Sequence, residues 1–153
     1  MTIILEKASL HDYKEIYALQ IQSFRALLDR YQDYDYSPGA EKIERTIQRL
    51  EEPETDYYFI SLNGKHIGAL QICNYGKLSK LKQIFIIPTY QGYGYAQQAI
   101  SAVERLYPNA EHWELDTILQ EEKLCYLYEK MGYQRTGKTH RIKDGMDLVF
   151  YRK

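Results

Sequence analysis

The sequence predicts an α/β fold, a mixed β-sheet covered by helices, in one domain that spans residues 1–153. The length of 153 residues suits a single domain. Hydrophobic residues make up 44% of the chain and charged residues 27%, which is the composition of an ordinary globular protein. Short apolar runs of strand type alternate along the chain with segments whose apolar residues recur at helical spacing. This order of elements predicts a mixed sheet with helices packed on it.

A short strand and a capped helix are predicted near the beginning of the chain. Ile3-Ile4-Leu5 is an apolar run of strand type. Ser9 and Asp12 have the spacing of a capping box, with Asp in the place of the usual Glu. The helix behind the box has apolar residues at roughly helical spacing: Tyr13, Ile16, Tyr17 and Phe24.

A loop and a second helix are predicted next. Segment 29–40 has no clean period, which is typical of a loop. Ser37 and Pro38 suit the N-cap and the first position of a helix. The helix is predicted to turn its glutamates and arginines toward solvent and to bury a stripe made of Ile43, Ile47 and Leu50.

The middle of the chain predicts a β-hairpin, a third strand and a helix. Asn63-Gly64 separates an apolar run over 57–62 from another that ends at Cys73, a strong hairpin signal. The third run, over 78–87, ends at Pro88. After a glycine-rich turn comes a helix that Pro108 ends, with these apolar residues at helical spacing: Ala96, Ala99, Ile100, Val103, Leu106 and Tyr107.

The last third of the chain predicts a strand, a helix and a hairpin. The strand covers 112–118. Gly132 suits the C′ position of a helix marked by Leu124, Leu127, Tyr128 and Met131. The stretch 133–151 is predicted to form two antiparallel strands that turn near Lys143-Asp144-Gly145.

Charge and composition argue against several classes of function. The net charge is −1, which gives no general attraction to nucleic acid or anionic membranes. No apolar run approaches the roughly 20 residues that span a bilayer, and the first residues lack the basic region of a secretory signal. Cys73 and Cys125 are therefore expected to be reduced thiols in the cytoplasm. The absence of a CxxC or a His/Cys cluster predicts no metal site.

The most informative stretch is a strand that runs into a glycine turn and then a helix. The turn contains Gln91, Gly92, Tyr93, Gly94, Tyr95 and Ala96. This geometry leaves backbone N–H groups at the positive end of the helix, where phosphate oxygens bind readily. A Walker A loop would need Lys and Ser or Thr after Gly94, and a dinucleotide fingerprint would need glycine at Gln97. A plain turn without a ligand remains the alternative.

Two motifs together resemble a known family. Residues 91–96 are similar to the Q/R-x-x-G-x-G/A signature of the GCN5-related N-acetyltransferase (GNAT) superfamily. Ile86-Ile87-Pro88 stands where that family usually has V-x-P, and residues 127–133 resemble its L-Y-E-K-x-G-F segment. The order and spacing of the motifs also fit. The resemblance covers residues 1–153 and is strongest over 81–137.

The resemblance implies a fold, a co-substrate and a reaction. Two parallel central strands would splay apart, one containing Ile84–Ile86 and the other Leu115–Thr117. The pantetheine arm of acetyl-CoA would bond to backbone groups of Ile84, Phe85 and Ile86, and its pyrophosphate would bind the amides of Gln91, Gly92, Tyr93, Gly94, Tyr95 and Ala96. Tyr128, the catalytic residue, would place its hydroxyl near the thioester sulfur. The acetyl group would pass directly to a primary amine of a small molecule or peptide. Self-association into a homodimer is common among such folds.

The sequence departs from this family at two positions, which keeps an alternative function open. Gln83 stands where many relatives carry a carboxylate, and Glu121 stands where relatives often have Asn. Glu121 is suited to capping the helix that follows it. Glu114 and Asp116 alternate on the next strand, where solvated or structural roles are equally good interpretations. The alternative to an enzyme is a non-catalytic acyl-CoA-binding or sensing module on the same fold.

Other candidate residues stay open from the sequence. His66 and His112 are isolated, as structural histidines usually are. Cys125 lies one turn before Tyr128, but a buried thiol is the better interpretation than an acetyl-cysteine. The resemblance implies that the acceptor meets the loop over 29–36, whose acidic and aromatic residues suit a cationic amine; a solvated acidic loop without a ligand is the alternative. Arg25 and Arg30 would equally suit an acceptor carboxylate.

Overall fold

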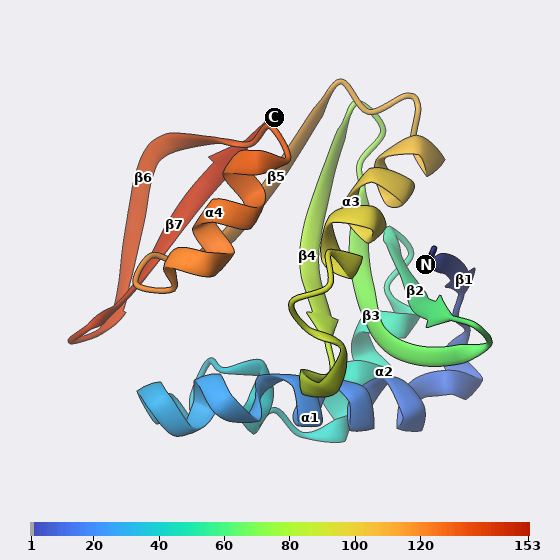
Figure 1. The fold of residues 1–153 in the computed structure, drawn as a ribbon, viewed down its shortest axis with the longest axis horizontal. Helices are drawn as coiled ribbons and strands as arrows, with labels where there is room; N and C mark the ends of the chain where they lie inside the picture. Colours follow the sequence, from blue (N-terminus) through green and yellow to red (C-terminus); the bar gives the residue numbers. More distant parts are fainter. Residues whose placement is uncertain (1) are drawn as a thin grey trace.

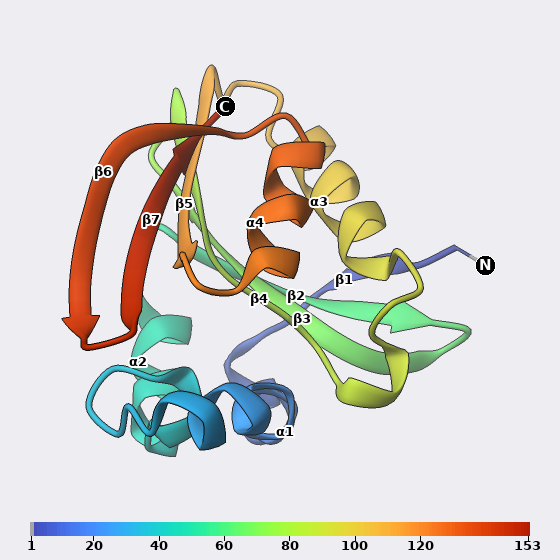
Figure 2. The ribbon, with the colours of Figure 1, turned by 60° about the vertical axis from the view of Figure 1, so that its left-hand side comes forward.

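The structure, a computed structural model, describes residues 2–153. Within these residues seven strands form one sheet in the order β1-β2-β3-β4-β5-β7-β6. The strands are β1 (Ile4–Lys7), β2 (Thr55–Leu62), β3 (Lys65–Asn74), β4 (Leu78–Ile86), β5 (His112–Ile118), β6 (Gln134–Lys143) and β7 (Met146–Arg152). The helices are α1 (Tyr13–Tyr31), α2 (Ile43–Glu51), α3 (Tyr95–Leu106) and α4 (Glu122–Lys130). Helices α1 and α2 cover one face of the sheet, and α3 and α4 cover the other (Figure 2).

The two central strands separate along their length. β4 and β5 are parallel and pair only over Leu78–Lys80 against His112–Glu114. Beyond these residues β4 stays paired with β3 and β5 with β7, and the two strands diverge (Figure 1). The splayed parallel strands predicted from the family resemblance are thus confirmed.

Each face of the sheet has its own apolar core. On the α3 side the predicted stripe of α3 is confirmed for Ala99, Ile100 and Val103, each fully buried, whereas Leu106 is half exposed. On the α1 side Ile16 and Phe85 are buried in a smaller core. The elements on both sides of the divergence of β4 and β5 are therefore held in place by packing.

Local turn signals in the sequence are confirmed. Asn63 and Gly64 have φ values of 52° and 82°, the left-handed conformation that a tight hairpin turn requires. The N–H of Ser9 donates to the carboxylate of Asp12 at 2.8 Å, which completes the capping box at a short 3₁₀ turn before α1. Gly132 follows α4 with a φ of 95°.

The second helix differs from its prediction. Helix α1 continues to Tyr31, so the connecting loop begins at Gln32. Ser37 and Pro38 begin only a single 3₁₀ turn, Pro38–Ala40, and α2 begins at Ile43. One N–H group of that short turn is satisfied locally, because the Ser37 hydroxyl accepts from the N–H of Gly39 at 3.2 Å.

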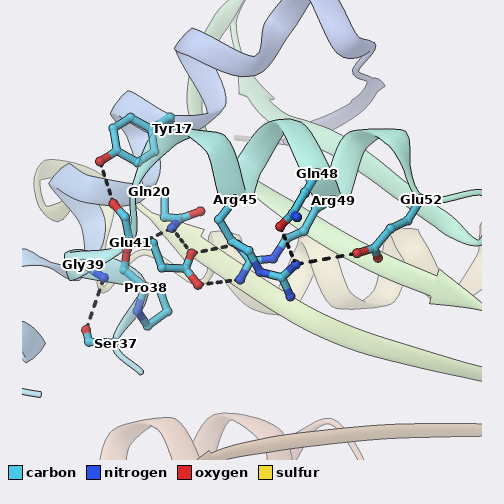
Figure 3. Close-up of polar contacts among 10 residues, drawn as sticks. All are labelled: Tyr17, Gln20, Ser37, Pro38, Gly39, Glu41, Arg45, Gln48, Arg49 and Glu52. Carbon is cyan, nitrogen blue, oxygen red and sulfur yellow. Dashed lines mark hydrogen bonds and ion pairs between the residues drawn. The ribbon is translucent and has the colours of Figure 1, made fainter. Parts of the chain in front are cut away.

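The inner face of α2 also differs, because it carries charge. Arg49 is 9% exposed and Thr46 is fully buried, whereas Ile43, Ile47 and Leu50 are only partly buried. The two terminal nitrogens of Arg49 donate to Glu41 at 2.7 and 2.5 Å. Glu41 accepts in addition from Gln20 at 2.7 Å (Figure 3). The prediction that the arginines of this helix face solvent was wrong for Arg49, because a partner 8 residues earlier compensates its charge.

Three further findings bear on function. None of the helices among residues 2–153 combines the length and the apolar character that crossing a membrane requires. Cys73 and Cys125 are buried and free. The described chain contains no group of three or more His, Cys, Asp or Glu side chains arranged to hold a metal ion.

Candidate active site

A cleft of about 700 Å³ opens where β4 and β5 diverge. Its walls come from α1, β4, the glycine turn, β5 and α4. Most of the residues predicted to bind the cofactor line it: Ile84, Phe85, Ile86, Gln91, Gly92, Gly94, Tyr95 and Ala96. Tyr93 is the exception, since its side chain is 67% exposed and its ring stacks on that of Tyr95 at 5.8 Å. The fold thus brings residues 84–86 of β4 and most of the glycine turn, residues 91–96, to the same cavity.

The glycine turn leaves a row of backbone donors free. Within residues 2–153, the N–H groups of Gly92 to Ala96 donate to no protein acceptor, and Gln98 is the first to bond back to the N-cap Gly94, at 3.2 Å. The N–H of Gln91 is already used within the turn, because it donates to the carbonyl of Pro88 at 3.2 Å. Five consecutive amides at the positive end of α3 therefore remain for an anion.

The two glycines of the turn keep the approach to these amides open. Gly92 and Gly94 have φ values of +83° and +82°, which side-chain-bearing residues rarely adopt. A Cβ added to either would meet no atom within 4 Å, so the space in front of the turn is empty of protein. A phosphate group can therefore come close to the backbone here, as the predicted pyrophosphate site requires.

Gln91 has a role that its motif position alone did not reveal. Its side-chain amide donates to the carbonyl of Ile86 at 2.7 Å. This bond fixes the glycine turn to the end of β4. It also uses one of the backbone carbonyls that the sequence assigned to the pantetheine arm.

Tyr128 lies on α4 with its hydroxyl free. It is 7% exposed and lines the cleft. Its ring packs against those of Tyr133 and Tyr151, each at a centroid distance of 6.3 Å. In the described part of the chain the hydroxyl makes no hydrogen bond to protein. Burial, and next the negative charge of Asp116, raise the pKa of Tyr128, so at neutral pH the group remains a protonated donor.

Asp116 supplies the cleft with an unpaired carboxylate. It lines the cleft from β5, and its side chain makes no hydrogen bond or ion pair with another residue of 2–153. Asp116 is exposed in the open cleft, but the surrounding walls partly desolvate its carboxyl and raise the pKa of Asp116, although Lys82 and Lys80 act in the opposite direction. Glu114, by contrast, is 3.8 Å from both Lys80 and Arg152 and does not line the cleft. The structure thus distinguishes Asp116 from Glu114, two acids that the sequence could not tell apart.

Glu121 joins the two sides of the cleft. Its carboxylate accepts from Arg30 at 2.6 Å and from the Tyr31 hydroxyl at 2.5 Å, so it ties the end of α1 to the start of α4. Lys143, in the β6–β7 hairpin, adds a bond to the carbonyl of Tyr31 at 2.8 Å. Glu121 occupies the N-cap position of α4 but makes no side-chain capping bond there, so its predicted capping role was wrong. Its carboxylate instead pairs with Arg30, 91 residues away in the sequence.

The loop over 29–36, which was expected to meet the acceptor, lies only partly at the cleft. Arg30, Tyr31, Asp33 and Tyr36 line the cavity, whereas Arg25 does not. Asp33 is 6% exposed, and its Oδ1 accepts the N–H groups of the two residues that close the loop. The main role of the Asp33 carboxylate is therefore to hold the conformation of the loop.

The remaining candidates lie elsewhere. Cys125 is 4% exposed and its thiol points at the carbonyls of residues 118 and 119, outside the cleft, which agrees with the buried-thiol interpretation. His66 lies between Glu15, at 2.7 Å, and Glu6, at 3.0 Å. Burial alone would lower the pKa of His66, but these hydrogen bonds and charges outweigh it and raise the pKa above its ordinary value of 6.5.

Comparisons with known proteins agree with this geometry. The profile described as the acetyltransferase (GNAT) family matches residues 13–133. An acetyltransferase from Thermus thermophilus has a TM-score of 0.76, covers 100% of this chain and 97% of its own, and is 14% identical. A GNAT family acetyltransferase from Elizabethkingia anophelis, solved with acetyl-CoA bound, has a TM-score of 0.70, 16% identity and coverage of 99% and 97%. A mutant of the spermidine N-acetyltransferase SpeG from Vibrio cholerae has a TM-score of 0.71, 18% identity and coverage of 99% and 93%.

A search of curated protein sequences finds no match. The low identities of the solved structures show a shared fold, and the family profile adds the sequence relationship. The profile covers well over half of the chain and includes both the glycine turn and Tyr128. The chain therefore belongs to the acetyltransferase (GNAT) family.

Proposed function

We propose that the protein transfers the acetyl group of acetyl-CoA to a primary amine by direct attack. The observation that carries this proposal is the row of five free amides from Gly92 to Ala96, which opens on the same cleft as the Tyr128 hydroxyl. The amides fit the diphosphate of coenzyme A, and the bound co-substrate supplies an acetyl thioester. The two free thiols fit a reducing compartment, so we expect the reaction to take place in the cytoplasm.

The acceptor amine must lose a proton before it attacks. For an amine with a pKa near 10.4, deprotonation at pH 7 costs about 4.6 kcal/mol. We assign the acceptance of this proton to Asp116, because it lines the cleft and its side chain has no protein partner among the described residues. Its raised pKa makes it a stronger base than an ordinary carboxylate. Gln83, at the position of the family's usual carboxylate, has no basic group to offer.

Tyr128 acts on the leaving group, the thiolate of coenzyme A. A departing thiolate with a pKa near 8.5 is stabilised by a nearby hydroxyl donor. The raised pKa of Tyr128 disfavours complete proton transfer, so its main contribution is a hydrogen bond. The free hydroxyl is available for that bond because no protein group in residues 2–153 competes for it.

The test is consumption of acetyl-CoA across a panel of small amines and peptides. Asp116→Asn should lower kcat/KM by roughly 10²-fold and remove the titration of the carboxyl from the acidic side of the pH profile, leaving only the fall in rate that protonation of the amine itself causes. Glu114→Gln is the matched control, since this neighbouring acid lies outside the cleft. An unchanged pH profile in Asp116→Asn would exclude it as the base. Binding of coenzyme A with no turnover on any amine would favour the non-catalytic acyl-CoA-binding module instead.

A further inference from the structure

A second pocket of about 300 Å³ adjoins the cleft on the α2 side of the sheet. Lys82 and Gln83 line both cavities, so the two cavities meet at these residues. Its other walls include Arg45 and Arg49 from α2 and Gln71 from β3. None of these residues belongs to the glycine turn or to the surroundings of Tyr128.

The charges of this pocket favour an anion. Arg45, Arg49 and Lys82 line it, against the single carboxylate of Glu52. Glu52 is 3.8 Å from Arg45, a long and half-exposed pair, and Lys82 makes no ion pair within residues 2–153. The guanidinium of Arg49 is compensated and fixed by Glu41 behind it (Figure 3). With Arg49 compensated by Glu41, Arg45 and Lys82 together exceed Glu52 by one positive charge, and Arg45 also donates to Gln48 at 3.2 Å.

The floor of the pocket adds an unsatisfied amide. Gln71 and Gln83 are direct partners in the β3–β4 register, and Gln71 is only 3% exposed. The Oε1 of Gln83 is buried without a partner among the described residues. Buried polar atoms are nearly always hydrogen-bonded in native proteins, so this amide is suited to a bound group. Only after rotation by 180° would this amide present its NH₂ group, rather than the acceptor oxygen, to an anion.

The opposite wall has the opposite sign. Asp116 lies on β5, across the divergence from Lys82 on β4. A molecule that spans the junction therefore meets a carboxylate at one end and a net positive charge at the other. Charge complementarity of this kind selects an acceptor that carries both an amine and an anionic group.

From this arrangement we infer that the acceptor is a primary amine that carries a carboxylate or a phosphate, with its anionic group held in the second pocket by Arg45 and Lys82. The inference rests on the proposed function, because the amine end is the group that is acetylated. The two anions share the chemistry that the pocket recognises, so the experiment uses both.

Paired acceptors test the inference kinetically. One pair is 6-aminohexanoate and its uncharged amide, and the other is phosphoethanolamine and ethanolamine. Arg45→Gln should raise KM for the anionic member that the pocket recognises by roughly tenfold and leave KM for its uncharged partner unchanged. Lys77→Gln is the control, since it removes one positive charge from a side chain that is 84% exposed and lies outside both cavities. Equal KM values within both pairs, or no response to Arg45→Gln, would overturn the inference while acetylation still proceeded.

Calorimetric titration of the same four compounds separates this inference from the proposed function. Saturable binding of 6-aminohexanoate or phosphoethanolamine that weakens in Arg45→Gln, and not in Lys77→Gln, supports the anion pocket even if no amine is acetylated. Failure of both anionic compounds to bind the wild-type protein refutes it, whatever the acetylation assay shows.

Discussion

Replacing Gly94 with alanine separates a role in cofactor binding from a role in folding. Gly94 has a φ of +82°, and an added Cβ would meet no protein atom within 4 Å. The cost to folding is therefore the left-handed backbone alone, about 1 kcal/mol. For a domain of this size, that cost lowers Tm by about 2–4 °C. The same Cβ would stand in the space through which we expect the phosphate groups to approach.

We expect Gly94→Ala to weaken the binding of coenzyme A about tenfold, in addition to the loss of folding stability. A tenfold weaker Kd corresponds to about 1.4 kcal/mol. At a coenzyme A concentration 100 times the wild-type Kd, the ligand stabilises the wild-type protein by about 2.7 kcal/mol. In Gly94→Ala the same concentration is only about ten times Kd, so the stabilisation falls to about 1.4 kcal/mol.

Thermal unfolding with and without coenzyme A measures both quantities. Gly76→Ala is the matched control, because Gly76 has a φ of +86°, has no atom within 4 Å of an added Cβ and lies outside the cleft. Both variants should lose similar stability without ligand, and only Gly94→Ala should lose ligand stabilisation. Full ligand stabilisation of Gly94→Ala would refute the assignment of this turn to phosphate binding.

Three other perturbations have definite outcomes. Tyr128→Phe should lower kcat roughly 10²-fold in a steady-state assay with an unchanged Kd for acetyl-CoA, and an unaffected kcat would remove the hydroxyl from the mechanism. Thermal stability should fall as pH rises through and above 6.5, because the raised pKa of His66 means that its protonated form stabilises the folded state. His66→Gln should flatten this dependence on pH. If the full dependence persisted in His66→Gln, other groups would be its cause. Arg49→Met should lower the free energy of unfolding in urea by about 3 kcal/mol, since it leaves Glu41 without its counter-charge. The double variant with Glu41→Leu should recover most of this loss. Equal losses in the single and double variants would show that the charge pair is not the cause.

Features set by neighbouring residues were predictable from the sequence. Asn63-Gly64 determines its own turn, and Ser9 with Asp12 forms a capping box within four residues. The glycine turn was equally local, because its strand, its glycines and its helix are consecutive. The separation of β4 and β5 came from the family resemblance, since no local pattern determines where a sheet opens.

Features that depend on distant partners were not predictable in this way. Glu121 meets Arg30 across 91 residues, and no helical pattern indicates that contact. Alternation along β5 puts Glu114 and Asp116 on the same face, so the sequence could not choose between them. The structure distinguishes their surroundings, because Glu114 pairs with Lys80 at the closed end of β4 and β5, whereas Asp116 lies where the two strands have diverged.

The amide resonances of the glycine turn test the central claim most directly. Coenzyme A is added to isotope-labelled protein while the backbone N–H signals of Gly92 to Ala96 are followed by NMR. If these five amides bind the diphosphate, their signals should shift more than those of any other segment and saturate with the occupancy of the ligand. Saturable binding of coenzyme A that left all five signals in place would contradict the account.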